Sequence, residues 1–207
     1  MTDAALDPGR RDFLHIATGA FAATGAIFAA WPFIDQMNPS ADVLAAAEPV
    51  KVDLSTIAPG QQISVMWRGH PMFIVNRTQG ALEKLKSPAL LARLRDPESA
   101  ARQQPGYATN WARALKPEYL VLIGVCTHLG CIPEFKPDAG SLGPDWPGGY
   151  FCPCHGSKYD LAGRVFKAVP APLNLPVPPY RFADDQTLVI GENPPGERFA
   201  LSDIMQL

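Results

Sequence analysis

The stretch CPCHGSKYD, residues 152–160, places two cysteines and a histidine within four consecutive positions. A second stretch, CTHLGC at residues 126–131, again carries a histidine between two cysteines. Together they contain all four cysteines of the 207-residue chain and two of its four histidines. Thiolates and imidazoles are protein ligands of zinc and iron, so the sequence predicts a metal centre assembled from two loops.

The composition is typical of a globular protein with short structural elements. Hydrophobic residues make up 47% of the chain and charged residues 18%, which provides enough apolar material for a buried core. The formal net charge of -2 gives no basic excess for binding nucleic acid. The 22 prolines and 17 glycines favour many turns and short strands. At about 150 residues per domain, the length indicates one globular domain with an additional segment.

An apolar run near the N-terminus is that additional segment. Residues 13–34 contain no Asp, Glu, Lys or Arg, and at ~1.5 Å per residue they are long enough to cross a ~30 Å hydrocarbon layer. Arg10 and Arg11 precede the run in RRDFL, which resembles a twin-arginine export signal. A cleaved signal peptide is the alternative, because LAAAE at residues 44–48 offers small residues to a peptidase. The run exceeds the ~7 to 15 apolar residues usual in a signal peptide, which favours a retained anchor over residues 13–35.

The charges and composition around the anchor indicate how the chain is arranged. Since positive residues stay on the cytoplasmic side, we expect residues 1–12 to form a cytoplasmic tail and the bulk of the chain to be exported. Residues 36–49 mix turn formers with alanines, which indicates a flexible tether that reaches on the order of 50 Å when extended. We expect the head domain over residues 50–191 and a C-terminal tail over residues 192–207.

Short apolar and β-branched runs predict an all-β head. Leucines at helical spacing predict one or two short helices within residues 81–103. Residues 132–148, between the two cysteine segments, receive no role. The segments expected as strands are residues 50–57, 61–69, 71–77, 118–125, 149–152, 175–183 and 186–192, with a hairpin over residues 159–167.

Six candidate ligands are too many for one tetrahedral metal ion. Two thiolates and two imidazoles would satisfy zinc, which is the simplest alternative. Cys154 and His155 are adjacent, so in an extended loop their side chains point apart and do not easily serve one metal. A surplus pair of cysteines can form a disulfide in an exported protein. The spacing alone does not say which cysteines bind metal and which form the disulfide.

This division into two cysteines, two histidines and a cysteine pair resembles the Rieske 2Fe-2S proteins, in which histidine replaces cysteine on one of two irons. With the anchor, CTHLGC and CPCHGSKYD resemble the Rieske subunit of ubiquinol-cytochrome c reductase, and the resemblance covers most of the chain. It implies a Rieske-type antiparallel β-sandwich head with a helix-loop insertion, one N-terminal transmembrane helix and one 2Fe-2S cluster per chain.

The resemblance implies a buried iron and an outer iron with different ligands. Two neutral imidazoles in place of two thiolates leave the oxidised cluster formally neutral. This raises the expected potential toward ~-150 to +300 mV, against ~-400 mV for all-cysteine ferredoxins. The implied set is Cys126 and Cys152 for the buried iron, His128 and His155 for the outer iron, and Cys131 with Cys154 for the disulfide.

Residues next to the ligands also receive roles from the resemblance. Ser157 and Tyr159 are expected to donate hydrogen bonds to a bridging sulfide and to a cysteine sulfur. Such donors stabilise the extra electron and raise the potential.

Residues on the surface of the centre are implied to contact partners. His155 is expected to contact the quinol and accept its proton, and Leu129 is expected at the docking tip. Pro170 and Pro172 belong to the loop expected to cover the cluster. Val169, in the same loop, stands where the family commonly has glycine.

The implied function is electron transfer within ubiquinol-cytochrome c reductase. The subunit takes one electron from ubiquinol at cytochrome b, coupled to proton release, and passes it to cytochrome c₁. The implied location is the bacterial inner membrane, in contact with lipid and within a dimeric complex, with a cytoplasmic N-terminus and a periplasmic head. The subunit is one part of an oxidoreductase and completes no turnover alone.

Three other functions share parts of these motifs. The Rieske subunit of an arsenite oxidase-type enzyme shares twin-arginine export, and a soluble Rieske ferredoxin or oxygenase domain shares the ligand spacing. A zinc-binding module is the third. The anchor, the tether and CTHLGC favour the quinol enzyme. His15 and His70 receive no metal-binding role.

Overall fold

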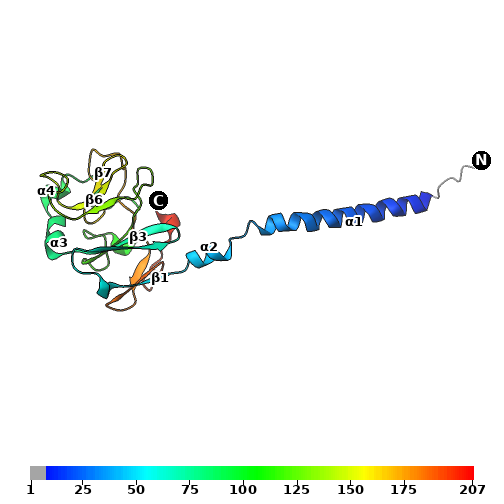
Figure 1. Cartoon of the computed structure of the whole chain (residues 1–207), viewed down its shortest axis with the longest axis horizontal. Helices are drawn as coiled ribbons and strands as arrows, with labels where there is room; N and C mark the ends of the chain where they lie inside the picture. Colours follow the sequence, from blue (N-terminus) through cyan, green and yellow to red (C-terminus); the bar gives the residue numbers. More distant parts are fainter. Residues whose placement is uncertain (1–7) are drawn as a thin grey trace, which may run out of the picture. The chain divides into compact units, whose positions relative to one another are not determined.

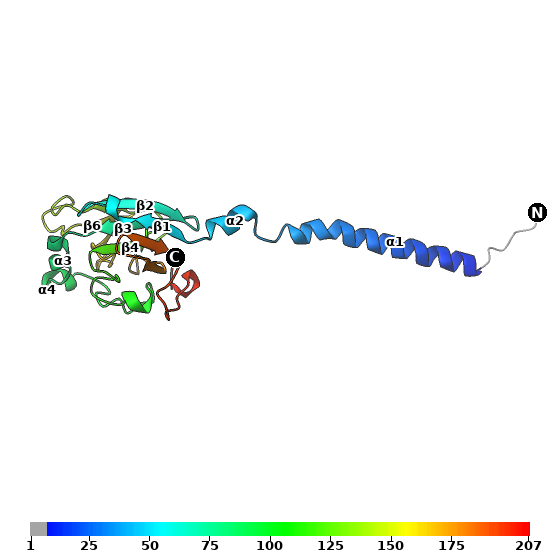
Figure 2. The same cartoon turned by 90° about the horizontal axis from the view of Figure 1, so that it is seen from below.

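A computed structural model describes residues 8–207 of the chain (Figure 1 and Figure 2). Residues 1–7 of the expected cytoplasmic tail lie outside the described residues. The backbone divides into two units after Ala45. The first unit is mainly one helix, and the second contains all the strands of the described chain.

Helix α1, Pro8–Asp35, makes up most of the N-terminal unit and is drawn in blue in Figure 1. The helix begins at Pro8, before the predicted anchor, and therefore includes Arg10 and Arg11. Proline is favoured in the first turn of a helix, where its missing N–H needs no partner. Residues Gly9–Asp35 are long and apolar enough to cross a membrane, and none of their apolar stretch is buried against protein.

Helix α2, Ala41–Ala46, lies within the predicted tether. Ser40 precedes it and caps it, because its hydroxyl accepts from Val43 N at 3.4 Å and its carbonyl accepts from Leu44 N at 3.1 Å. A helix rises ~1.5 Å per residue, against ~3.3–3.6 Å for extended chain. The tether therefore reaches less far than a fully extended segment of the same length.

The head is built from three antiparallel sheets of three strands each, in the orders β1-β9-β8, β2-β3-β4 and β5-β6-β7. All six strand pairings between residues 8 and 207 are antiparallel, as expected for the predicted fold class. The strands are β1 Val50–Asp53, β2 Gln62–Trp67, β3 His70–Asn76, β4 Tyr119–Ile123, β5 Glu134–Lys136, β6 Gly149–Cys152, β7 Ser157–Tyr159, β8 Tyr180–Phe182 and β9 Thr187–Ile190.

Strands β3 and β4 lie in the middle of the hydrophobic core. Ile74 of β3 and Leu120 of β4 have no exposed surface. Gly124 follows β4, and a Cβ at this position would overlap the ring of Phe73. That ring stacks on Tyr150 of β6, with the ring centroids 5.6 Å apart. The stacking holds the end of β4 next to β6, and these two strands lead into the two cysteine segments.

The one or two short helices predicted within residues 81–103 both form, near the start of that segment. Helices α3, Gln79–Leu85, and α4, Pro88–Leu91, form as expected, but residues 92–103 form turns. The reason is local, because the Asp96 carboxylate accepts hydrogen bonds from the backbone N–H groups of Ala100 and Ala101 at 2.9 and 3.0 Å. This side chain closes a turn where a helix would need backbone carbonyls as acceptors.

Other predicted boundaries also needed correction. Strand β5 lies in the segment 132–148 and pairs with β6, which the sequence did not predict. The hairpin predicted over residues 159–167 is only an isolated bridge between Tyr159 and Val165, because β7 pairs with β6 instead. The first predicted strand ends early in a short 3₁₀ turn, Leu54–Thr56.

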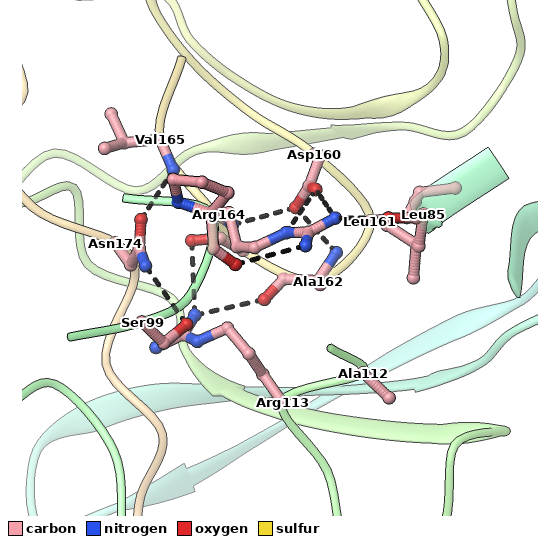
Figure 3. A network of polar contacts seen from close by, with 12 residues as sticks. Leu85, Ser99, Ala112, Arg113, Asp160, Leu161, Ala162, Arg164, Val165 and Asn174 are labelled. Carbon is pink, nitrogen blue, oxygen red and sulfur yellow. Dashed lines mark hydrogen bonds and ion pairs between the residues drawn. The ribbon is translucent and has the colours of Figure 1, made fainter. Parts of the chain in front are cut away.

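A buried polar network joins the loops that contain Arg113, Arg164 and Asn174 (Figure 3). Arg164 Nη2 lies 2.8 Å from Asp160 Oδ2, with both side chains buried. Arg113, also buried, donates to the carbonyl oxygens of Ala162 at 3.0 Å and Leu175 at 2.8 Å. Burial lowers the pKa of Arg113 to about 9, so the guanidinium remains charged at neutral pH. These charged hydrogen bonds therefore fix residues 160–164, at the end of the second cysteine segment.

The C-terminal tail, residues 192–207, packs on the head. Phe199 and Ile204 are buried in the main core. Arg102 forms an ion pair with Asp203 at 3.1 Å, beside the 3₁₀ turn Leu201–Asp203. The backbone N–H of Met205 donates to Arg102 O at 2.9 Å. The tail is therefore part of the folded head.

Candidate metal centre

Two tight loops carry the cysteines and histidines, and they have the same backbone turn. Gly130 N donates to Cys126 O, and Gly156 N donates to Cys152 O, each at 2.9 Å. The two glycines adopt φ values of 81° and 78°, in the left-handed region that favours glycine. Each loop therefore turns back four residues after its first cysteine. The cysteine at the start of each turn lies in the core, and the rest of the loop projects outward.

The first cysteine of each loop is a buried free thiol. Cys126 is 1% exposed and Cys152 is 2% exposed, and neither forms a disulfide. Burial raises the pKa of the Cys152 thiol, and a hydrogen bond with Cys126 raises it further. The two buried thiols are therefore neighbours. A metal ion at this position would have to displace their protons, because only thiolates bind metal strongly.

The two histidines of the loops lie together nearer the surface. The ring centroids of His128 and His155 are 4.7 Å apart, and the ring planes are nearly perpendicular. His128 is half-buried and His155 is exposed. The centre thus changes from sulfur on its buried side to nitrogen on its accessible side.

Cys131 and Cys154 form a disulfide in the structure, across a sequence separation of 23 residues. This pairing agrees with the one that the family resemblance implied. The Cys152 sulfur lies within 4.8 Å of both disulfide sulfurs. This group of three sulfurs is not a metal site by itself, because two of them are already bonded to each other. The donors that remain are two buried thiols and two imidazoles, a set that fits a Rieske cluster.

The predicted hydrogen-bonding residues are both buried beside the loops. Tyr159 Oη lies 3.2 Å from Cys126 Sγ and also accepts from Thr127 N at 3.2 Å. Ser157 Oγ accepts from Ala171 N at 3.0 Å, which connects it to the proline-rich loop. The structure therefore places Tyr159 next to a cysteine sulfur. Donation by Ser157 to a sulfide stays a prediction.

Apolar side chains of the first cysteine loop and of the proline-rich loop are exposed. Leu129 is 71% exposed, and Pro170 and Pro172 are also exposed. Ile132, which the sequence reasoning did not include, is 59% exposed next to the disulfide cysteine Cys131. Its position directly after CTHLGC is the signal that would have identified it.

Thr127 is a further residue that sequence reasoning missed. It lies between Cys126 and His128 and is buried. Its hydroxyl donates to Leu173 O at 2.7 Å, which connects the first cysteine loop to the segment that follows the proline-rich loop. The available signal in the sequence was that the residue between Cys126 and His128 carries a hydroxyl group, which can form a hydrogen bond to another loop.

Family models and a solved structure resemble parts of this chain. The family model "Rieske [2Fe-2S] domain" matches residues 93–179, and "Ubiquitinol-cytochrome C reductase Fe-S subunit TAT signal" matches residues 1–40. A solved chain titled "Hyperthermophilic respiratory Complex III" is 25% identical, with a TM-score of 0.47, over 84% of this chain and 98% of its own.

Curated relatives match along nearly the whole chain. The ubiquinol-cytochrome c reductase iron-sulfur subunit of Allochromatium vinosum is 50% identical over 188 residues, which is 89% of each protein. That of Rhodospirillum rubrum is 51% identical over 185 residues, which is 89% of this chain and 93% of the relative. These matches confirm the predicted family and its 2Fe-2S cofactor. The chain belongs to the family of Rieske iron-sulfur subunits of ubiquinol-cytochrome c reductase, the electron-transfer subunits of an oxidoreductase complex.

Proposed function

We propose that Cys126 and Cys152 bind the inner iron of one 2Fe-2S cluster and that His128 and His155 bind its outer iron. The observation that carries this assignment is the burial gradient across the four side chains. The thiols are almost completely buried, and the imidazoles lie toward solvent. The disulfide removes Cys131 from the ligand set and holds the two loops at one distance.

When bound, the cluster supplies a one-electron acceptor with a potential in the ~-150 to +300 mV range, because neutral imidazoles replace two thiolates. His155 is exposed, so its ring nitrogen that does not bind iron can accept a hydrogen bond from the quinol hydroxyl and hold its proton. Tyr159 Oη lies 3.2 Å from Cys126 Sγ, where a donated hydrogen bond stabilises added negative charge on sulfur. The group that accepts the proton is then a ligand of the cluster that accepts the electron.

We further propose that the apolar tip docks on cytochrome b, where ubiquinol is oxidised, and then on cytochrome c₁. Leu129, which follows His128, is exposed, and so are Pro170 and Pro172 of the loop that contacts Ser157; these apolar groups can exclude water from the contact. Arg10 and Arg11 favour a cytoplasmic N-terminus, with the head on the periplasmic side of a bacterial inner membrane. Residues 36–49 then serve as the tether, within a dimeric complex.

Metal analysis and electron paramagnetic resonance (EPR) of the full chain in membranes test this proposal. We expect two irons per chain, no zinc, and a reduced-state signal whose shape changes when a quinol-site inhibitor is added. His155→Gln should abolish the signal. His70→Gln is the matched control, because His70 begins β3 and lies outside the centre, and its signal should match that of the wild type.

Three results would refute parts of the proposal separately. Stoichiometric zinc without iron would remove the cluster assignment entirely. An iron-sulfur signal that ignores quinol-site inhibitors would leave the cluster intact but contradict the assignment to quinol oxidation. Retention of the signal in His155→Gln would show that another residue binds the outer iron.

A further inference from the structure

The last residues of the chain contact the first cysteine loop. Gln206 Nε2 donates a hydrogen bond of 2.6 Å to the backbone carbonyl of Thr127. Thr127 lies between Cys126 and His128, and only 4% of its surface is exposed. A residue 79 positions away in sequence therefore supplies the hydrogen-bond donor to a carbonyl within the C-x-H motif.

Each polar group of Thr127 has a partner from a different part of the head. Its N–H donates to Tyr159 Oη at 3.2 Å, and its hydroxyl donates to Leu173 O at 2.7 Å. Gln206 provides the partner for the remaining group, the carbonyl. This carbonyl belongs to the peptide unit whose nitrogen is that of His128. The amide of Gln206 therefore fixes the orientation of the peptide plane from which His128 projects.

Gln206 is itself held through its backbone, independently of its side chain. Gln206 N donates to Gln103 Oε1, and Gln103 Nε2 donates to Gln206 O, both at 3.0 Å. Gln103 is completely buried and also donates to Asn174 O at 3.1 Å. Ile204, two residues earlier, packs in the main core. A change of the Gln206 side chain therefore removes the contact with Thr127 while the tail keeps its other attachments.

We propose that Gln206 is a positioning residue for the metal centre, which sets the orientation of the Thr127–His128 peptide and through it the approach of the His128 imidazole to the outer iron. This inference rests on the proposed assignment of His128 as an iron ligand. Groups that orient a metal ligand tune the electronic properties of the metal as well as its retention. The C-terminus thus has a role in the redox centre in addition to its packing on the head.

The test replaces Gln206 in the full chain and examines the cluster directly. Gln206→Leu keeps the approximate size and removes the donor. We expect shifted or broadened EPR g-values in the reduced state, a shifted midpoint potential, and loss of the cluster to a chelator roughly threefold to tenfold faster, as for one lost hydrogen bond. Gln206→Lys restores a donor of sufficient length and should recover the retention time. Gln186→Leu is the matched control, the same change in an exposed loop.

The outcomes separate this inference from the proposed function. Absence of a Rieske signal in the wild type would remove the ligand assignment on which both depend. A normal wild-type signal, with Gln206→Leu indistinguishable from Gln186→Leu in g-values, potential and retention, would overturn the positioning role alone. If Gln206→Leu does not accumulate, Gln206→Glu replaces it, since it has the same length and lacks the amide donor. Equal behaviour of Gln206→Glu and the wild type would likewise overturn the role.

Discussion

Replacement of Asp160 by asparagine is expected to destabilise the head by about 3–5 kcal/mol, because it leaves a buried guanidinium without its counter-charge. Arg164 Nη2 lies 2.8 Å from Asp160 Oδ2, and the two side chains are 1% and 0% exposed. At this distance an effective dielectric constant of ~20 gives an attraction of about 6 kcal/mol before desolvation is subtracted. Burial lowers the pKa values of Arg77 and Arg113 to about 10 and about 9, and the charge of Asp160 partly offsets this lowering. The carboxylate therefore balances more than one buried cation.

A double-mutant cycle separates this charge effect from lost hydrogen bonds. Arg164→Met alone should also cost about 3–5 kcal/mol, because it leaves Asp160 as an unpaired buried anion. It also leaves the carbonyl oxygens of Leu85 and Pro97 without the donors they now have at 2.8 and 3.3 Å. The double variant leaves neither member of the Asp160–Arg164 pair without its partner, but it still lacks these two donors, at about 1–3 kcal/mol each. It should therefore lose about 2–6 kcal/mol, less than the sum of the two single variants.

Urea unfolding of the detergent-solubilised chain, followed by tryptophan fluorescence and cluster absorbance, measures these differences. With a slope of about 2 kcal/mol per molar urea, a loss of 4 kcal/mol lowers the midpoint by about 2 M. Glu134→Gln is the control, because its ion pair with Lys136 is exposed and should contribute less than about 1 kcal/mol. Strictly additive losses in the double variant, or an Asp160→Asn shift no larger than that of Glu134→Gln, would refute the charge-balance explanation.

Three further changes address the metal centre and its support. Cys131→Ser opens a loop of 23 residues and should lower the free energy of unfolding by ~3.4 kcal/mol on the chain-entropy model. The visible absorbance of the cluster should then be lost faster than in the wild type, and an unchanged rate of loss would contradict this expectation. Tyr159→Phe removes the hydroxyl 3.2 Å from Cys126 Sγ and should lower the midpoint potential in a redox titration, since donors to sulfur favour the reduced state; an equal or higher potential would show that the hydroxyl does not donate to sulfur. Gly149→Ala directs a Cβ into the carbonyl oxygen of Tyr159 and should lower the unfolding midpoint far more than Gly140→Ala, which meets no atom within 4 Å; similar midpoints would mean that the backbone relaxes.

The ligand segments could be predicted from the sequence because their information is local. A cysteine, a histidine and a turn glycine lie within each short segment, so the order of the letters already restricts the geometry. The strands β3 and β4 were predictable for a similar reason, since their apolar runs are continuous. The assignment of cysteines to metal or disulfide was not predictable from spacing, because all four cysteines satisfy the same local pattern. Only the family resemblance, and then the structure, distinguished Cys131 and Cys154 from the buried pair.

The remaining errors arise where distant groups replace local backbone partners. Residues 92–103 form turns after the two short helices, because the Asp96 carboxylate closes a turn there and Arg164 donates to the carbonyl oxygen of Pro97. Strand β5 has only three residues and exists through its pairing with β6. The contact of Gln206 with Thr127 joins residues 79 positions apart in sequence. No local pattern records such contacts, so a single sequence gives no signal for them.

The two sides of the centre differ in access to water, and this difference predicts which substitutions act on which step. Tyr159 and the thiols are buried, so a change there alters the energy of an added electron without changing the surface that a quinol contacts. Leu129 is 71% exposed, and a change there alters docking without changing the field at sulfur. His155 combines both properties, because it is exposed and is the proposed ligand of the outer iron. Variants at Tyr159 should therefore change the midpoint potential with little change in the apparent affinity for quinol. Variants at Leu129 should change the apparent affinity for quinol with little change in the midpoint potential. A Leu129→Ala variant with an altered potential but unchanged apparent affinity would show that the exposed tip and the buried sulfur are not separable in this way.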